Sequence, residues 1–234
     1  MLADRIVPKT FGQLGEDAVI ENHLGWLGLP VNQPGIYLDI GAYHPTRGSN
    51  TYRFYRRGCS GYAIDIGARK RKIWDRVRSR DIFIEGAVVP DSYKESFVDF
   101  AQSDNYGAAT DHVKTYGVID DVKKNIRGGV VAIPASVLKI KVLSDPAWKA
   151  APWRFISIDI EGLDHEFLCD LDLVELAPDV VAVERFLPEG ISDWEKDIFL
   201  ANSCELVSNM RRRNFSLQSV CGPTLIFVRI ESRK

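Results

Sequence analysis

The sequence predicts an open, doubly wound α/β fold, in which helices cover both faces of a mostly parallel sheet. Short apolar runs that end in an acidic residue recur along the chain, and segments with helical spacing separate them. The last two predicted strands are joined by too few residues for a crossover, which indicates an antiparallel pair. Strands that alternate with helices, joined by right-handed crossovers, form a doubly wound sheet.

Apolar runs and turn residues place the elements of the first half in order. A helical pattern leads into the first apolar run, and Ser49, Asn50 and Thr51 supply cap-type residues for a short helix that stops near Gly58. The predicted elements are a helix at 16–27, a strand at 35–41, the short helix, a strand at 61–66, a helix at 69–80 and a strand at 82–89. The basic residues of the helix at 69–80 are interpreted as a solvated face.

The second half begins with a stretch of weak periodicity. Polar and turn-forming residues dominate 90–129, so we expect a lid or insertion there, within a single domain that spans 1–234. Regular patterns then return. They predict strands at 130–133, 155–160, 179–184, 205–210 and 224–230, and helices at 136–143, 165–173 and 194–202.

Composition excludes several classes of partner. The formal charge of −2 gives no general attraction for nucleic acid, so none is expected as a partner. The first ten residues lack an apolar core of signal-peptide length, and no later segment approaches a membrane span. We therefore expect a soluble, cytoplasmic protein. Four widely spaced cysteines form no C-x-x-C pair, which argues against a structural zinc site. The oligomeric state stays open.

Four acidic residues fall at the carboxyl ends of predicted strands: Asp39, Asp65, Asp159 and Glu184. In doubly wound sheets, ligands bind beyond these strand ends. Clustered acids are costly unless they meet hydroxyls, amines, a cation or water. The sequence therefore predicts a ligand site along this edge of the sheet.

Five segments together resemble the FkbM family of S-adenosylmethionine-dependent O-methyltransferases, a class I methyltransferase group. They are GQLGED at 12–17, DIGAYHP at 39–45, SNT at 49–51, IDIEG at 158–162 and PDVVAVE at 178–184. The resemblance runs over most of the chain from residue 12 to 186. It implies a seven-stranded, Rossmann-like sheet whose last strand runs against the others.

This resemblance assigns cofactor roles to residues near the strand ends. Gly41, with its neighbours Asp39 and Ala42, would let the backbone approach the methionyl part of S-adenosylmethionine. Amide groups near Ser49 and Asn50 would bind its carboxylate.

Two later positions would hold the nucleoside. Asp65 has two oxygens that can accept both ribose hydroxyls, and Ala87 would lie near the adenine. Nicotinamide cofactors use a strand-end acid in the same way, although the loop with only Gly41 and Gly48 departs from their denser glycine pattern.

O-methylation needs a group that removes the proton of the acceptor hydroxyl. The candidate catalytic residues are Glu161, Asp159 and His44, with His165 as a further histidine. Alternatively, a magnesium ion held by Asp159, Glu161 and Glu184 would lower the pKa of the hydroxyl. The sequence leaves both routes open.

The family implies a small-molecule acceptor, and the strand-end acids favour a sugar or glycan hydroxyl over a greasy substrate. Two other functions remain open. One is an NAD-dependent oxidoreductase that uses the same acids. The other is a cofactor-binding scaffold without turnover.

Overall fold

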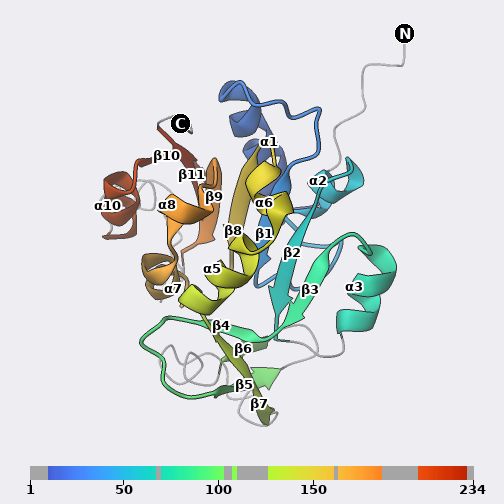
Figure 1. The fold of residues 1–234 in the computed structure, drawn as a ribbon, viewed down its shortest axis with the longest axis vertical. Coiled ribbons are helices and arrows are strands. Elements are labelled where there is room, and N and C mark those ends of the chain that lie inside the picture. The colour runs from blue at the N-terminus through green and yellow to red at the C-terminus, as the bar shows by residue number, and fades with distance from the viewer. Residues whose placement is uncertain are drawn as a thin grey trace.

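Seven strands form the central sheet of the computed structural model, in the order β10-β11-β9-β8-β1-β2-β3 (Figure 1). The strands are β1 (Ile36–Ile40), β2 (Ser60–Asp65), β3 (Ile82–Glu85), β8 (Arg154–Ile158), β9 (Val180–Glu184), β10 (Phe215–Cys221) and β11 (Thr224–Arg229). Neighbours from β9 to β3 are parallel, whereas β11 is antiparallel to both β9 and β10. This confirms the predicted fold class, a doubly wound, mostly parallel seven-stranded sheet with an antiparallel last strand.

The structure describes residues 10–66, 70–102, 107–109, 126–160, 163–185 and 205–230. Within them the helices are α1 (Glu16–Trp26), α2 (Tyr52–Arg56), α3 (Arg71–Val77), α5 (Ala135–Leu143), α6 (Pro146–Ala150), α7 (Asp164–Asp170), α8 (Leu173–Leu176) and α10 (Glu205–Arg212). No helix among the described residues is long and apolar enough to cross a bilayer. The helix predicted at 194–202 lies outside the described residues.

The helices divide between the two faces of the sheet. On β1, Leu38 packs in a core with buried residues of α5, α6, α7, α8 and α10. The next side chain back, Tyr37, points the other way and packs with Ile20 of α1 and Phe54 of α2. Trp74 of α3 packs against Ala63 of β2, on the same side as α1 and α2. The result is a three-layer sandwich around the sheet.

A second, four-stranded sheet follows the order β4-β7-β5-β6. It contains β4 (Ala87–Val89), β5 (Phe97–Gln102), β6 (Gly107–Ala109) and β7 (Ile126–Pro134), with β4 parallel to β7 and the other pairs antiparallel. Figure 1 shows this sheet beyond the carboxyl ends of β2 and β3. The described part of 90–129, where sequence periodicity is weak, therefore belongs largely to this sheet.

The single strand predicted at 82–89 is wrong. The chain leaves the main sheet after Glu85 and enters the second sheet at Ala87. Gly86 is the junction, and a β-carbon there would lie 2.3 Å from Ile133 Cδ1 of β7. Its amide donates to the Asp65 carbonyl at 3.0 Å, which ties the junction to the end of β2. An apolar run does not reveal a change of sheet.

The strand predicted at 205–210 is also wrong, because this segment forms α10. Its buried side chains, Leu206, Val207 and Met210, share one helical face. The antiparallel partner of β11 is β10, and Gly222, with φ of 56°, lies in the turn between them. The predicted helix at 165–173 is divided into α7 and α8.

Candidate cofactor and active site

The four strand-end acids lie on the same face of the main sheet. Next to each acid in the sequence is an apolar residue that packs in the core beneath α5, α6, α7 and α8: Ile40, Ile64, Ile158 and Val183. Because side chains alternate along a strand, the acids one position before or after these residues project toward α1, α2 and α3. Asp39, Asp65 and Asp159 interact electrostatically with one another, and Asp159 also interacts with Glu184. The predicted gathering of acids along one sheet edge is present in the structure.

Gly41 makes the turn at the end of β1 in a conformation that favours glycine. Its φ is 78°, and a β-carbon would lie only 1.6 Å from the carbonyl oxygen of Asp159. The amides of Gly41 and Ala42 both donate to the Ile64 carbonyl, at 2.9 and 3.0 Å. The Asp159 amide donates to the Ile40 carbonyl at 2.9 Å. This turn therefore packs directly against the strand ends of β2 and β8, which fixes the floor of the site.

Asp39 lies under the turn and is joined to a buried arginine. Thr51 Oγ1 donates to its Oδ2 at 2.5 Å, and Arg78 Nη1 donates to the same threonine oxygen at 2.8 Å. Burial raises the pKa of Asp39 to about 6, against the opposing effects of Arg78 and Thr51. The Asp39 carboxyl therefore titrates closer to neutral pH than an ordinary aspartate does.

Arg78 is a residue that sequence reasoning missed. It follows α3 and is fully buried, although the basic residues of this segment are predicted to form a solvated face. Its Nε pairs with Asp81 Oδ2 at 2.6 Å, and its Nη2 donates to the Tyr37 hydroxyl at 2.7 Å. The hydroxyl in turn donates to Asp81 Oδ1 at 2.7 Å. An acid three residues after an arginine is the signal in the sequence that could have indicated this pair.

Asp65 at the end of β2 is held by two donors. The amide of Tyr43 donates to Oδ2 and Lys70 Nζ donates to Oδ1, each at 2.7 Å. Tyr43 adopts a positive φ of 45°, and the lysine lies 5.0 Å from the centroid of its ring. The loop after β1 and the segment after β2 therefore orient the carboxylate that is predicted to bind ribose.

Asp159 and Glu184 come together at the ends of β8 and β9. Burial raises the pKa of Asp159 well above its usual range, and a hydrogen bond to Glu184 raises it further. A hydrogen bond between two carboxyl groups requires a proton on one of them, and burial makes two adjacent negative charges costly. Glu161, the third predicted magnesium ligand and a predicted catalytic residue, lies outside the described residues. No group of three possible metal ligands is found among the residues that the structure describes.

His44 is half-buried in the loop after β1. Its Nδ1 accepts from the backbone amides of Thr46 and Arg47, at 3.1 and 3.2 Å. A neutral His44 therefore carries its proton on Nε2 and can donate, but not accept, at that atom. Burial lowers the pKa of His44, and the cations Arg47 and Lys70 lower it further. Both features favour the neutral ring.

Ser49 and Asn50 join the loop to two other parts of the chain. Ser49 Oγ accepts from the amide of Tyr52, the first residue of α2, at 3.1 Å. Its own amide donates to the Phe11 carbonyl at 3.0 Å. Asn50 Nδ2 donates to Ser157 Oγ of β8 at 3.1 Å. The loop at 49–50 therefore contacts both the segment before α1 and strand β8, which are far from each other in the sequence.

The remaining predicted residues have other environments. Ala87 is buried in β4 and packs in an apolar cluster with Val89, Val98 and Val130.

Asp164, which sequence reasoning missed, accepts a hydrogen bond from the Ile160 amide at 2.8 Å. His165 is partly buried on α7. Asp164 lies six residues after the end of β8, and an acid at that spacing carries no distinct pattern in the sequence.

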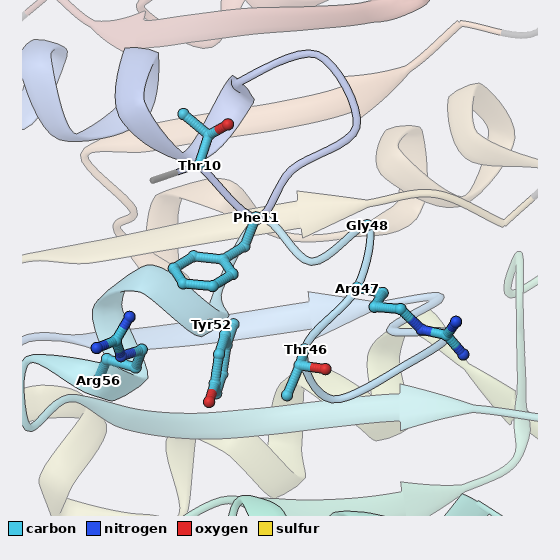
Figure 2. A pocket seen from close by; sticks show the side chains of 7 residues that line it. All are labelled: Thr10, Phe11, Thr46, Arg47, Gly48, Tyr52 and Arg56. Atoms are coloured by element: carbon cyan, nitrogen blue, oxygen red, sulfur yellow. The ribbon is translucent and has the colours of Figure 1, made fainter. Parts of the chain in front are cut away.

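A cavity of about 520 Å³ lies beside the loop that joins β1 to α2 (Figure 2). It is lined by Gly48 and by the side chains of Thr10, Phe11, Thr46, Arg47, Tyr52 and Arg56. Thr46 links it to the candidate site, because its Oγ1 lies 3.2 Å from His44 Nδ1. Neither the cavity nor its arginines were among the predicted site residues.

A scan against protein-family models finds no match, and a search of curated proteins finds no relative. Among solved structures, the chain is similar to the Burkholderia thailandensis 1,6-didemethyltoxoflavin-N1-methyltransferase with bound 1,6-didemethyltoxoflavin and S-adenosylhomocysteine. Identity is 13% and the TM-score is 0.39, over 91% of this chain and 74% of that one. It is also similar to monomeric WbdD, at 12% identity and a TM-score of 0.37, over 92% of this chain but only 40% of that one. Similarity this low assigns no function, which must be argued from the site.

Proposed function

We propose that the protein is an S-adenosylmethionine-dependent methyltransferase that methylates a hydroxyl of a small molecule, a sugar or glycan in particular. The observation that carries the proposal is the edge of the main sheet, where the Gly41 turn packs against Asp159 and where Asp159 interacts electrostatically with the acids that end β1, β2 and β9. In the sheet to which this edge belongs, β11 runs antiparallel to β9, an arrangement that suits a class I methyltransferase. Because many functions share this fold, the acids decide between them.

The charge of this edge favours S-adenosylmethionine over a nicotinamide dinucleotide. Asp39 and Asp159 have raised pKa values, first through burial and then in part through the other carboxyl groups. A cation bound here would relieve that repulsion, whereas a pyrophosphate would add to it. S-adenosylmethionine carries a sulfonium and an ammonium group. The carboxyl groups at this edge therefore match the positive groups of S-adenosylmethionine.

The predicted cofactor residues keep their proposed roles. Gly41 and Ala42 would adjoin the methionyl part, with Asp39 beneath them, and Ser49 and Asn50 would lie at its polar end. Asp65, oriented by the Tyr43 amide and by Lys70, would hold the ribose. Ala87 would contribute to the apolar side of the adenine site, because it lies in the cluster that Ile66 also joins.

The cofactor would supply a methyl group on a positively charged sulfur. The chain's own residues would handle the acceptor proton. Burial and the hydrogen bond to Glu184 raise the pKa of Asp159, so its ionised form is a stronger base than an ordinary carboxylate, and Asp159 is proposed to accept this proton. Glu161 is proposed as a second acid at the same strand end. His44 would donate a hydrogen bond from Nε2, since its Nδ1 accepts backbone amides. A magnesium ion on Asp159, Glu161 and Glu184 is the alternative to direct proton removal.

The proposal takes residues 1–234 as one cytoplasmic methyltransferase domain, in which the second sheet forms the lid or insertion. Strand-end acids suit an acceptor with several hydroxyls, because carboxylates accept hydrogen bonds from such groups. A sugar or glycan fits this chemistry.

The test is transfer of label from S-adenosylmethionine to a panel of sugars, glycans and macrolides, with and without a chelator. We expect transfer to at least one sugar, reduced at least about 100-fold in Asp159→Asn, the loss typical of a general base. Asp75→Asn, which removes an exposed acid from α3, is the matched control and should leave the rate unchanged. Absence of transfer, together with binding of NAD, would instead favour an oxidoreductase. Cofactor binding without transfer to any acceptor would favour a scaffold.

A further inference from the structure

The cavity beside the β1–α2 loop has its own chemistry, distinct from the acidic edge. Figure 2 shows Phe11 and Tyr52 with Arg56 beside them, and Arg47 beyond Thr46 with its guanidinium group directed away from the two rings. The two rings meet edge to face, with centroids 4.8 Å apart. The lining of the cavity therefore combines two aromatic rings with two arginines.

Pairing of the neighbouring arginines shows which charges are left for a ligand. Arg53 and Arg57, on either side of Arg56, both form ion pairs with Glu21. Arg56 lies instead over the Phe11 ring, at 5.6 Å from its centroid. Among the described residues, neither Arg56 nor Arg47 has an acidic partner. Glu21 thus pairs with the two arginines on either side of Arg56, whereas the two arginines that line the cavity are left without an acidic partner among the described residues.

Hydrogen-bonding groups accompany these cations. Thr10, Thr46 and Tyr52 each bring a hydroxyl to the cavity. Guanidinium groups and hydroxyls are the side chains that bind phosphate, sulfate and carboxylate oxygens. An aromatic wall favours a ligand that also carries a flat or apolar part. The matching ligand is a small molecule with an anionic group beside a ring.

The cavity adjoins the candidate active site through short contacts. The Ser49 amide donates to the Phe11 carbonyl, and Thr46 and Arg47 both donate to His44 Nδ1 from their amides. We propose that this cavity binds the anionic group of the methyl acceptor, so that the enzyme selects a phosphorylated, sulfated or carboxylated substrate. Its role as an acceptor site rests on the proposed function, whereas anion binding does not.

The test is a calorimetric titration of the full chain with phenyl phosphate, and with benzyl alcohol as the neutral counterpart. We expect phenyl phosphate to bind and benzyl alcohol to bind at least about tenfold more weakly, the loss of one charged hydrogen bond. Arg47→Gln and Arg56→Gln should each weaken phenyl phosphate binding by about tenfold. Arg76→Gln, an equal charge change on the exposed side of α3, should not.

Equal affinity of the three variants, or equal affinity for the two ligands, would overturn the proposal. A second titration with S-adenosylhomocysteine separates it from the proposed function. We expect S-adenosylhomocysteine to bind the wild type and both cavity variants alike, and not to compete with phenyl phosphate. Competition would assign the cavity to the cofactor and overturn the acceptor role. If S-adenosylhomocysteine fails to bind while the arginine variants still weaken phenyl phosphate, the methyltransferase proposal fails and the anion site stands.

Discussion

Asp39 is 5% exposed and receives a hydrogen bond from Thr51, which Arg78 also contacts. The position of Asp39 at the end of β1 could be predicted from the sequence, because an acid that closes an apolar run is visible there, whereas its buried contacts could not. The spacing of Arg78 and Asp81 could indicate an ion pair, but the burial of Arg78 could not be predicted, because its partners Tyr37 and Thr51 are brought to it only by folding.

The raised pKa of Asp39 predicts a specific dependence of stability on pH. Its folded-state value of about 6 lies above the ordinary value of 3.8, so the native state retains a proton that the unfolded state has lost. Ionisation of this group therefore favours unfolding as pH rises from 4 to 7. The difference in pKa corresponds to about 3 kcal/mol of unfolding free energy.

Asp39→Asn removes that dependence. The unfolding free energy of the variant, relative to wild type, should rise by about 2.4 kcal/mol between pH 4 and pH 7, measured by urea denaturation. Asp75→Asn, the exposed control, should keep the same difference from wild type at every pH. Parallel curves for Asp39→Asn and wild type would show that Asp39 has an ordinary pKa in the folded protein.

At the scale of elements, the strands with acidic ends were predictable and the divisions between elements were not. β1, β2, β8 and β9 follow apolar runs that close on an acid. The break at Gly86 was missed because a single glycine in an apolar run does not show which sheet each side joins. The helix α10 was missed because Leu206, Val207 and Met210 are too few residues to separate a helical from a strand period.

The turn after β1 can be tested with a matched pair of glycines. Gly41 and Gly28 have similar φ values, 78° and 70°, but a β-carbon at Gly28 would meet no atom within 4 Å. Gly28→Ala should therefore lose only the cost of a left-handed residue, about 1–2 kcal/mol. Gly41→Ala should lose more, because its β-carbon would overlap the Asp159 carbonyl.

The same variants report on the site through their binding of S-adenosylhomocysteine. We expect Gly28→Ala to bind it like wild type and Gly41→Ala to bind at least about tenfold more weakly, a loss of about 1.4 kcal/mol. Urea denaturation and calorimetric titration measure the two effects. Equal stability and equal binding of the two variants would show that the turn does not need a glycine for contact with β8.

For the whole molecule, topology explains why residues distant in sequence form one site. Parallel strands place Asp39, Asp65, Asp159 and Glu184 at one edge, and alternation places them on one face. That much could be predicted from the sequence. Lys70 on Asp65 and the two-arginine cavity could not, since their contacts come from loop conformations that no spacing rule describes.

The measurement that tests the central proposal most directly is a calorimetric titration with S-adenosylhomocysteine and, separately, with NAD. We expect wild type to bind S-adenosylhomocysteine and not NAD, because S-adenosylhomocysteine keeps the ammonium group and has no pyrophosphate to meet the acidic edge. Asp65→Asn should weaken that binding by about tenfold, as expected for a charged hydrogen bond to ribose, while Asp75→Asn should leave it unchanged. Binding of NAD without binding of S-adenosylhomocysteine would contradict the assignment of this edge to a methyl donor.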